Sequence, residues 1–373
     1  MELVFGQALP AINPLFQPVE VMMSKTSWSA ICWRNVSLSL LDQRRLPAEE
    51  VWLELTSAQD VADAIRDMVV RGAPAIGITA AYGVVLGAIN QKGQQKWYGM
   101  VVRDIEQLAA SRPTAVNLFW ALERMKTVLD NARDEASPPV AALIEEARLI
   151  HEEDCANNQR MSALALSTMQ HMSGEDPFSV MTHCNTGALA TGGHGTALGI
   201  IKAGASCGMI EHVHVNETRP WMQGARLTSW ELSRENIPLS LNVESAAALI
   251  MSKGNVKWLI VGADRIAANG DVANKIGTYT LAIAARYHGV KVMVAAPLSS
   301  FDLTIQSGGD IPVEERAGEE IMYQGNTRIA PENINAFNPV FDITPAALID
   351  VIVTEKGVIA QPTQDNIKNH VRV

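Results

Sequence analysis

Apolar and polar positions follow a regular alternation in the C-terminal half of this chain. Short apolar runs predict strands at 179–183, 212–216, 238–242, 257–262, 290–295 and 350–354. Amphipathic segments between most of these runs predict helices, including 223–235, 244–251 and 273–288. Strands that alternate with helices in this way are typical of a parallel, doubly wound sheet, so we expect an α/β fold.

The N-terminal third shows mainly helical periodicity with a little strand. Apolar runs at 28–33 and 36–42 predict strands of a small sheet. Ser57 and Asp60 have capping-box spacing at the start of an amphipathic helix, whose apolar stripe is Val61, Ile65, Met68 and Val69. A second helix is expected to start near Pro113, with an inner face formed by Leu118, Leu122, Met125 and Leu129.

Breaks in these patterns suggest how the chain is divided. A proline-rich stretch at 134–139 precedes a long helix, from about Val140 to His171, that would bridge two domains. We therefore expect an N-terminal extension, a smaller and mostly helical domain carrying a small β-sheet, and a Rossmann-like catalytic domain, at 1–27, 28–145 and 146–373. Residues 303–338 have little periodicity, as in many lids and binding loops.

Composition narrows the class of protein. The 373 residues are 47% hydrophobic and 19% charged, as in ordinary globular proteins, and the net charge of −10 disfavours nucleic acid or an anionic membrane as partner. Residues 72–90 lack charged side chains but are rich in glycine and alanine, so we expect a buried helix there. The four cysteines are scattered and the N-terminus lacks signal-peptide features, which favours a reducing, cytoplasmic location.

Two candidate reactive groups follow predicted strands. Cys184 lies between a strand and a glycine-rich loop that leads into a helix, where ligands bind in open α/β sheets and where thiol pKa values fall. An isolated cysteine is more often a small buried apolar residue. Asp264 ends an apolar strand, and partial burial there would raise its pKa towards that of a general acid. The alternative for Asp264 is a helix cap or an ion pair with Arg265 or Arg226.

Three cations stand at apparent helix starts, where cations are unfavourable: Arg71, Arg112 and Lys275. A shared phosphate would explain all three, although pairing with local carboxylates is the alternative. Gln223 is expected near the same cleft and suits hydroxyl groups. The glycines at 193, 195 and 199 do not fit a dinucleotide fingerprint, and the nearby histidines lack a metal-site signature. We therefore expect no nicotinamide cofactor and no metal.

Five segments together resemble the 5-methylthioribose-1-phosphate isomerases of methionine salvage. They are RGAPAIG (71–77), SRPTAVNL (111–118), THCNTGALAT (182–191), ETRPWMQGARLT (217–228) and GADRIAANGDVANKIGTY (262–279). The resemblance runs from about residue 28 to the C-terminus. This family is related to ribose-1,5-bisphosphate isomerases and to regulatory subunits of the translation-initiation guanine-nucleotide exchange factor, which share the fold, so fold alone does not decide activity.

The resemblance implies a set of roles. Cys184 and Asp264 become the catalytic pair, and the substrate contacts become Arg71, Gly72, Ala73, Arg112, Gln223, Asn274 and Lys275. It also implies a homodimer that needs no cofactor. The alternatives are an isomerase of 5-deoxyribose 1-phosphate or ribose 1,5-bisphosphate, and a non-catalytic protein that binds a sugar phosphate or nucleotide.

The implied reaction is an aldose–ketose isomerisation. Since the C1 oxygen of the sugar carries the phosphate, the bond between C1 and the ring oxygen must break while hydrogen moves from C2 to C1. Asp264 would protonate the ring oxygen, and Cys184 would act near C1 and C2. Proton transfer through an enol phosphate and a direct hydride shift both remain open.

Overall fold

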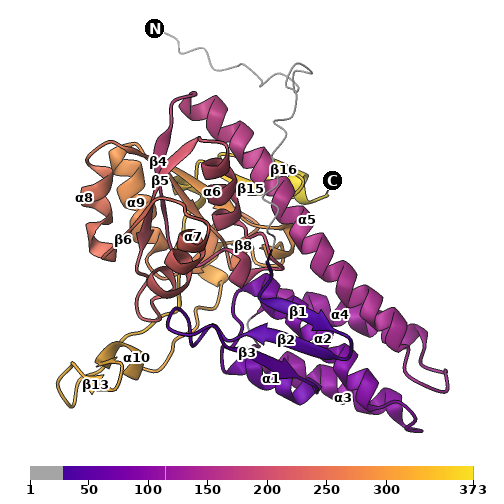
Figure 1. Cartoon of the computed structure of the whole chain (residues 1–373). Helices are drawn as coiled ribbons and strands as arrows, with labels where there is room; N and C mark the ends of the chain where they lie inside the picture. The colour runs from indigo at the N-terminus through magenta and orange to yellow at the C-terminus, as the bar shows by residue number, and fades with distance from the viewer. Residues whose placement is uncertain (1–27, 114, 373) are drawn as a thin grey trace.

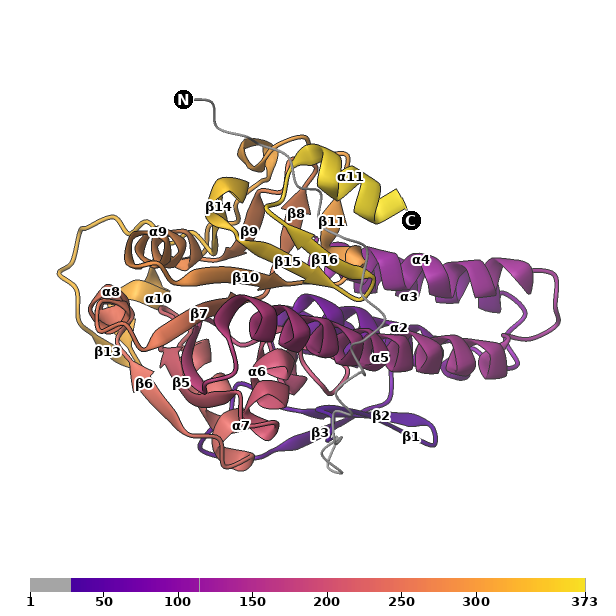
Figure 2. The ribbon, with the colours of Figure 1, turned by 90° about the horizontal axis from the view of Figure 1, so that it is seen from above.

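The computed structural model describes residues 28–113 and 115–372 and has a mixed α/β architecture (Figure 1). The extension predicted at 1–27 lies outside the described residues. A large, mainly parallel sheet occupies the C-terminal part, and a helical part with a small sheet packs beside it (Figures 1 and 2). The coarse prediction of an α/β fold is therefore confirmed.

The large sheet has seven strands in the order β16-β15-β10-β7-β4-β5-β6. All neighbours are parallel except β16, which pairs antiparallel with β15. The strands are β4 (Phe178–Thr182), β5 (Ile210–Asn216), β6 (Leu239–Asn242), β7 (Val256–Val261), β10 (Lys291–Ala295), β15 (Val351–Thr354) and β16 (Gly357–Ala360). The six predicted strands are all present. Strand order reverses between β4 and β7, and such reversals are where open α/β sheets bind ligands.

Helices cover both faces of this sheet, which explains why its strands are almost continuously apolar. In β7, Trp258 and Ile260 face one core, while Leu259 and Val261 face the other. The first core includes residues of α5 (Val140–Ser173), α6 (Ala197–Ser206) and α7 (Ser229–Arg234). The second includes residues of α8 (Ala247–Met251), α9 (Thr278–His288) and α11 (Gln364–Arg372).

A second, four-stranded sheet corrects one prediction. Its order is β11-β8-β9-β14, with β8 (Arg265–Ala267), β9 (Val272–Lys275), β11 (Phe301–Asp302) and β14 (Phe341–Thr344). The predicted helix at 273–288 is therefore wrong at its start, since α9 begins at Thr278 after Gly277, whose φ is +103°. Antiparallel pairing of β9 with β8 and β14 decides this segment, and such long-range pairing is invisible in local periodicity.

The helical part packs around α2 (Ala73–Asn90), which lies against its neighbours α1, α3, α4 and α5. The other helices are α1 (Ala58–Arg66), α3 (Trp97–Ala110) and α4 (Val116–Asn131), and the small sheet contains β1 (Ile31–Arg34), β2 (Ser37–Leu41) and β3 (Trp52–Leu55). The capping box of Ser57 and Asp60 is confirmed, but α1 ends before Met68, whose φ is +58°. The helix expected near Pro113 is α4, which begins at Val116 because Ala115 is extended.

Helix α2 is long and apolar enough to cross a membrane by length and composition, but 78% of it is buried inside the protein. The buried helix expected at 72–90 is therefore present. Helix α5 extends along both parts of the molecule (Figure 2). Its first half contributes Leu143, Ala147 and Ile150 to the core around α2, and its second half contributes Met161 and Met169 to the core under the large sheet.

We expect Leu129→Ala to lower the free energy of unfolding by about 2–5 kcal/mol, because Leu129 is 0% exposed in the core around α2 and its loss leaves a cavity. Chemical denaturation measures this change. Glu123→Ala on the exposed side of α4 is the control, and a similar small effect for both variants would contradict the assigned core.

Candidate functional site

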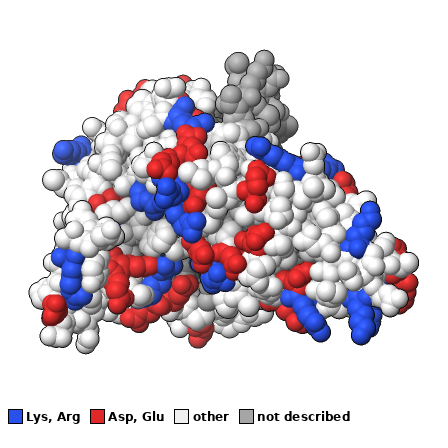
Figure 3. Space-filling model, turned by 60° about the horizontal axis from the view of Figure 1, so that its bottom comes forward, with Lys and Arg blue, Asp and Glu red and all other residues white. Residues whose placement is uncertain are grey.

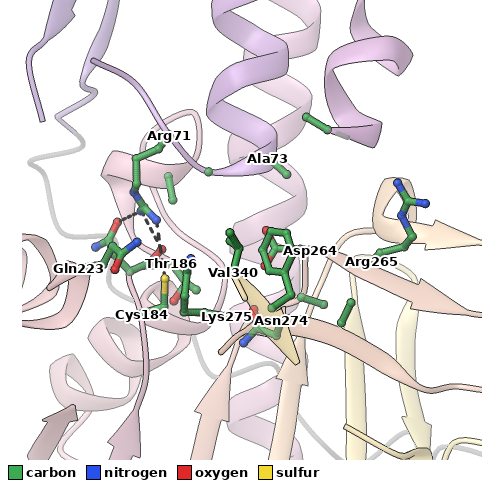
Figure 4. A pocket seen from close by; sticks show the side chains of 18 of the residues that line it. Arg71, Ala73, Cys184, Thr186, Gln223, Asp264, Arg265, Asn274, Lys275 and Val340 are labelled. Atoms are coloured by element: carbon green, nitrogen blue, oxygen red, sulfur yellow. Dashed lines mark hydrogen bonds between the residues drawn. The ribbon is translucent and has the colours of Figure 1, made fainter. Parts of the chain in front are cut away.

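One cavity lies at the carboxyl ends of β4 and β7, where strand order reverses (Figure 4). It contains all nine predicted site residues: Arg71, Gly72, Ala73, Arg112, Cys184, Gln223, Asp264, Asn274 and Lys275. Arg71 and Gln223 lie on the Cys184 side of the cavity, and Asn274 and Val340 lie on the Asp264 side. Residues up to 200 positions apart in sequence thus converge because β4 and β7 are adjacent.

The backbone of Cys184 is strained. Its φ is +65°, a left-handed conformation that is costly for a residue other than glycine, by about 1–3 kcal/mol. Two threonines hold this conformation: the N–H donates to Oγ1 of Thr218 at 2.8 Å, and the carbonyl accepts from Oγ1 of Thr228 at 2.5 Å. Strain of this kind concentrates at functional sites. Cys184 is 7% exposed and lines the cavity.

Arg71 lies beside the thiol. Its Nη1 is 3.9 Å from Sγ of Cys184, and its Nη2 donates to the carbonyl of Asn185 at 2.8 Å and to the Asn185 side chain. Helix α2 begins directly after Gly72, whose φ is +96°. A Cβ at Gly72 would meet Ala190 at 2.6 Å, so only glycine lets the start of α2 approach the loop that follows β4.

The three predicted cations converge on the same cavity. Among the described residues, no ion pair joins Arg71, Arg112 or Lys275 to a carboxylate, although Glu314 and Asp264 interact electrostatically with Arg112, and Asp264 does so with Lys275. Burial lowers the pKa of Arg112 and of Lys275. Arg71 lies two residues before α2, Lys275 ends β9 three residues before α9, and Arg112 lies four residues before α4. Buried cations without carboxylate partners favour an anionic ligand.

Asp264 is a buried acid surrounded by these cations. Burial raises its pKa, while Lys275, Arg71 and Arg112 oppose the rise. The proposed alternative partners are engaged elsewhere: Arg265 forms an ion pair with Asp302 at 3.5 Å, and Arg226 donates to backbone carbonyls of the 43–44 segment. A protonated carboxyl in this position is suited to general acid chemistry.

Lys275 connects the two candidate reactive groups. Electrostatic interactions with Cys184 and with Asp264 both counteract the lowering of its pKa by burial. Its Nζ also lies 5.4 Å from the ring centroid of Phe341, on β14. The pairing of β9 with β14 therefore places this cation between the thiol and the carboxyl.

Gln223 has an unused hydrogen-bond acceptor. It is 6% exposed, lines the cavity, and its Oε1 finds no partner among the described residues. An unpaired buried acceptor is unfavourable unless a ligand supplies a donor. A hydroxyl of the ligand would satisfy it, which agrees with the role predicted from the sequence.

Several cavity residues were not predicted. The segment 303–338, expected as a lid or binding loop, contains α10 (Glu319–Met322) and the hairpin of β12 (Tyr323–Gln324) and β13 (Thr327–Arg328), and brings Arg316 and Glu320 to the cavity. Glu320 accepts from Nε of Arg316 at 2.8 Å and from Nε1 of Trp221 at 2.9 Å. Low periodicity identified the segment, but no local signal identified these side chains.

The histidines near the cavity act as local hydrogen-bonding groups. Burial lowers the pKa of His183 and of His194 to about 4, so both are neutral at pH 7. His212 and His214 both contact Oγ of Ser240, at 3.1 and 3.0 Å. Within residues 28–113 and 115–372, no group of three or more His, Cys, Asp or Glu side chains is placed to hold a metal ion.

Comparison with known proteins gives consistent relatives. A family model described as the initiation factor 2 subunit family matches residues 69–361. Methylthioribose-1-phosphate isomerase of Pseudomonas aeruginosa (strain UCBPP-PA14) is 55% identical over 93% of this chain and 97% of the relative. The enzyme of the same name from Pseudomonas fluorescens (strain Pf0-1) is 57% identical over 89% and 92%.

Solved structures agree. The crystal structure of 5-methylthioribose 1-phosphate isomerase from Pyrococcus horikoshii OT3 has a TM-score of 0.85 and 38% identity, and covers 97% of this chain and 99% of that one. Translation initiation factor eIF-2B, subunit delta, from A. fulgidus has a TM-score of 0.83 and 37% identity, with 93% and 100% covered. Because these matches extend over most of its length, the chain belongs to the initiation factor 2 subunit family, in the group of the methylthioribose-1-phosphate isomerases.

Proposed function

We propose that this protein is an aldose–ketose isomerase that converts 5-methylthio-α-D-ribose 1-phosphate to 5-methylthio-D-ribulose 1-phosphate in methionine salvage. The observation that carries this proposal is one cavity in which three cations without carboxylate partners surround a thiol and a buried carboxyl. The enzymes that are 55–57% identical to this chain carry the name of this activity. A binding protein would need the cations but neither Cys184 nor Asp264.

The phosphate is held, in this proposal, by Arg71, Arg112 and Lys275, with Gly72, Ala73 and Asn274 contacting the substrate. The open start of α2 adds backbone N–H groups to the anion site, since the first N–H groups of a helix lack internal partners. Gln223 binds a sugar hydroxyl through its unpaired Oε1. These contacts fix the C1–C2 region against the two reactive side chains.

Asp264 acts as the general acid. Burial keeps its carboxyl protonated to higher pH than an ordinary aspartate, so it holds a proton for the ring oxygen as the bond from C1 breaks. The resulting carboxylate is stabilised by the cations that already face it: Lys275, Arg71 and Arg112. Cys184 acts at C1 and C2, by removing the C2 proton to give an enol phosphate or by accepting the C2 hydroxyl proton during a hydride shift. Each route uses only groups of this chain.

The finer organisation is also a proposal. We infer a Rossmann-like catalytic domain at 146–373 and a smaller helical domain at 28–145, because α5 contributes its two halves to different cores. We infer a homodimer, since Leu241, Leu249, Ile283 and Tyr287 expose apolar side chains at β6, α8 and α9. Four free cysteines support a cytoplasmic location. Acidic and basic side chains are interspersed on the face drawn in Figure 3.

The purified protein is expected to convert 5-methylthioribose 1-phosphate to a product with a C2 ketone signal in ¹³C NMR, with no cofactor added. If only ribose 1,5-bisphosphate or 5-deoxyribose 1-phosphate is converted, the protein is an isomerase of that sugar phosphate instead. If none of the three compounds is converted, a binding protein is favoured. The same assay in D₂O separates the two routes. A hydride that moves directly from C2 to C1 does not exchange with solvent, so deuterium at C1 of the product would exclude the hydride shift.

Asp264→Asn should retain less than about a tenth of wild-type kcat/KM, a loss above about 1.4 kcal/mol, because the amide has no proton to donate. Its thermal stability should exceed that of the wild type at pH 8. Since the pKa of Asp264 is raised in the folded state, the unfolded chain ionises first as pH rises and wild-type stability falls. The advantage of the variant should therefore shrink towards acidic pH.

Steady-state kinetics and unfolding scans over a pH series measure both effects in Asp264→Asn. Asp134→Asn is the control, because Asp134 is exposed and distant in sequence from any cavity residue. If Asp264→Asn retains most activity, Asp264 is not the general acid. If the stability difference between the variant and the wild type is the same at acidic and alkaline pH, the pKa of Asp264 is not raised by folding.

Lys275→Met should raise KM by about tenfold or more, because the variant removes a charge-assisted phosphate contact while keeping an apolar side chain of similar length. Inhibition by inorganic phosphate should weaken in parallel. Lys253→Met, on an exposed turn, is the matched control. Unchanged KM and phosphate inhibition in Lys275→Met would separate Lys275 from phosphate binding.

A further inference from the structure

A fully buried carboxylate lies behind the cavity without lining it. Glu231, on α7, is 0% exposed. Its Oε1 accepts from Nδ2 of Asn185 at 2.8 Å and from the N–H of Leu189 at 3.3 Å, and its Oε2 accepts from the N–H of Ala188 at 2.8 Å. A buried charge is tolerated only when hydrogen bonds or opposite charges compensate it, and here the loop that follows Cys184 donates those hydrogen bonds.

The loop is shaped to receive this carboxylate. A Cβ at Gly187 would lie 2.2 Å from Oε2 of Glu231, so a glycine is needed for the chain to close around it. The neighbouring cation, Lys202, is 4.0 Å from Oε2 but only 3.0 Å from Glu235, which is its direct partner. The main interactions of Glu231 are therefore with the 185–189 loop.

Glu231 fixes the orientation of the Asn185 amide. A carboxylate only accepts hydrogen bonds, so Asn185 must present its NH₂ group to Glu231 and its oxygen in the other direction. That oxygen accepts from Nη2 of Arg71, which also donates to the Asn185 carbonyl at 2.8 Å. Nη1 of the same guanidinium lies 3.9 Å from Sγ of Cys184. A continuous hydrogen-bonded chain thus joins the buried carboxylate to the thiol.

We propose that Glu231 is a positioning residue that holds the guanidinium of Arg71 beside the thiol of Cys184, acting through the Asn185 amide. The proposal rests on the proposed function for the roles of Arg71 and Cys184, which it deepens. Arg71 can then bind the phosphate and stabilise a thiolate without moving. Lys275 is the other cation that interacts with Cys184, and His183 beside it is neutral at pH 7, so neither depends on Glu231.

The test is the pH dependence of Cys184 alkylation by iodoacetamide, measured peptide by peptide with exposed Cys207 as internal reference. In Glu231→Gln the single amide oxygen is taken by the N–H groups of Ala188 and Leu189, so the NH₂ group faces Nδ2 of Asn185 and no longer holds it. Arg71 then moves from the thiol, and the pH midpoint of alkylation should rise by about half a pH unit or more. The kcat/KM should fall about tenfold or more. Changes in access to the thiol alter the maximal rate but not this midpoint.

Two further variants separate positioning from folding. Asn185→Ala keeps the hydrogen bonds of Glu231 to Ala188 and Leu189 but removes the side-chain link from Glu231 to Arg71. It should therefore raise the alkylation midpoint as much as Glu231→Gln does, and the double variant should raise it little further. Glu235→Gln removes a nearby carboxylate that does not contact the loop, and should leave the midpoint and kcat/KM unchanged.

A wild-type midpoint in folded Asn185→Ala would overturn the proposal, even if Glu231→Gln is altered, because Glu231 would then only stabilise the loop. If Glu231→Gln does not fold, Asn185→Ala decides alone. Alkylation needs no substrate, so absence of isomerase activity in the wild-type protein would count against the proposed function and leave this test intact.

Discussion

The site depends on three cations that are buried with one buried carboxyl, Asp264, and that form no ion pair among the described residues. The cavity is lined by Arg71, Arg112, Lys275 and Asp264. Burial lowers the pKa of Arg112 and Lys275 and raises the pKa of Asp264, so it favours the neutral form of each. Such a cluster is unfavourable in an empty pocket and becomes favourable when a dianionic phosphate enters. In the proposed mechanism the same charges would stabilise the carboxylate formed on Asp264, so phosphate binding and acid catalysis would use one electrostatic arrangement.

The fold brings these groups together through strand order. Because β4 and β7 are neighbours at the point where the sheet reverses its order, the residues after them share one edge, and the second sheet adds Lys275 from β9. The eIF-2B delta subunit of A. fulgidus has nearly the same TM-score as the isomerase of P. horikoshii. Architecture therefore does not distinguish an isomerase from an initiation-factor subunit, and the side chains in the cavity must do so.

Local patterns predicted what depends on neighbours in sequence. The apolar runs located six strands of the large sheet, and the capping box located α1, because both signals lie within a few residues. Residues 273–275 were wrongly predicted as the start of a helix, because their pairing with β14, about 70 positions away, leaves no local signal. Arg316 reaches the cavity from a segment without periodicity, and only the folded chain places it there. Candidate reactive groups were identifiable because they directly follow predicted strands.

The environment of Cys184 shows why such a site needs a rigid surrounding. The left-handed backbone of this residue is unfavourable, and Thr218 and Thr228 hold it from both sides. Glu231 and Asn185 constrain the next residues of the loop, and Gly72 and Gly187 allow the close approaches that these contacts need. Thr218, Thr228, Glu231 and Gly187 do not line the cavity and act only through this packing. The reactive geometry is therefore a property of the packed loop and its hydrogen bonds, which a motif of catalytic residues alone does not specify.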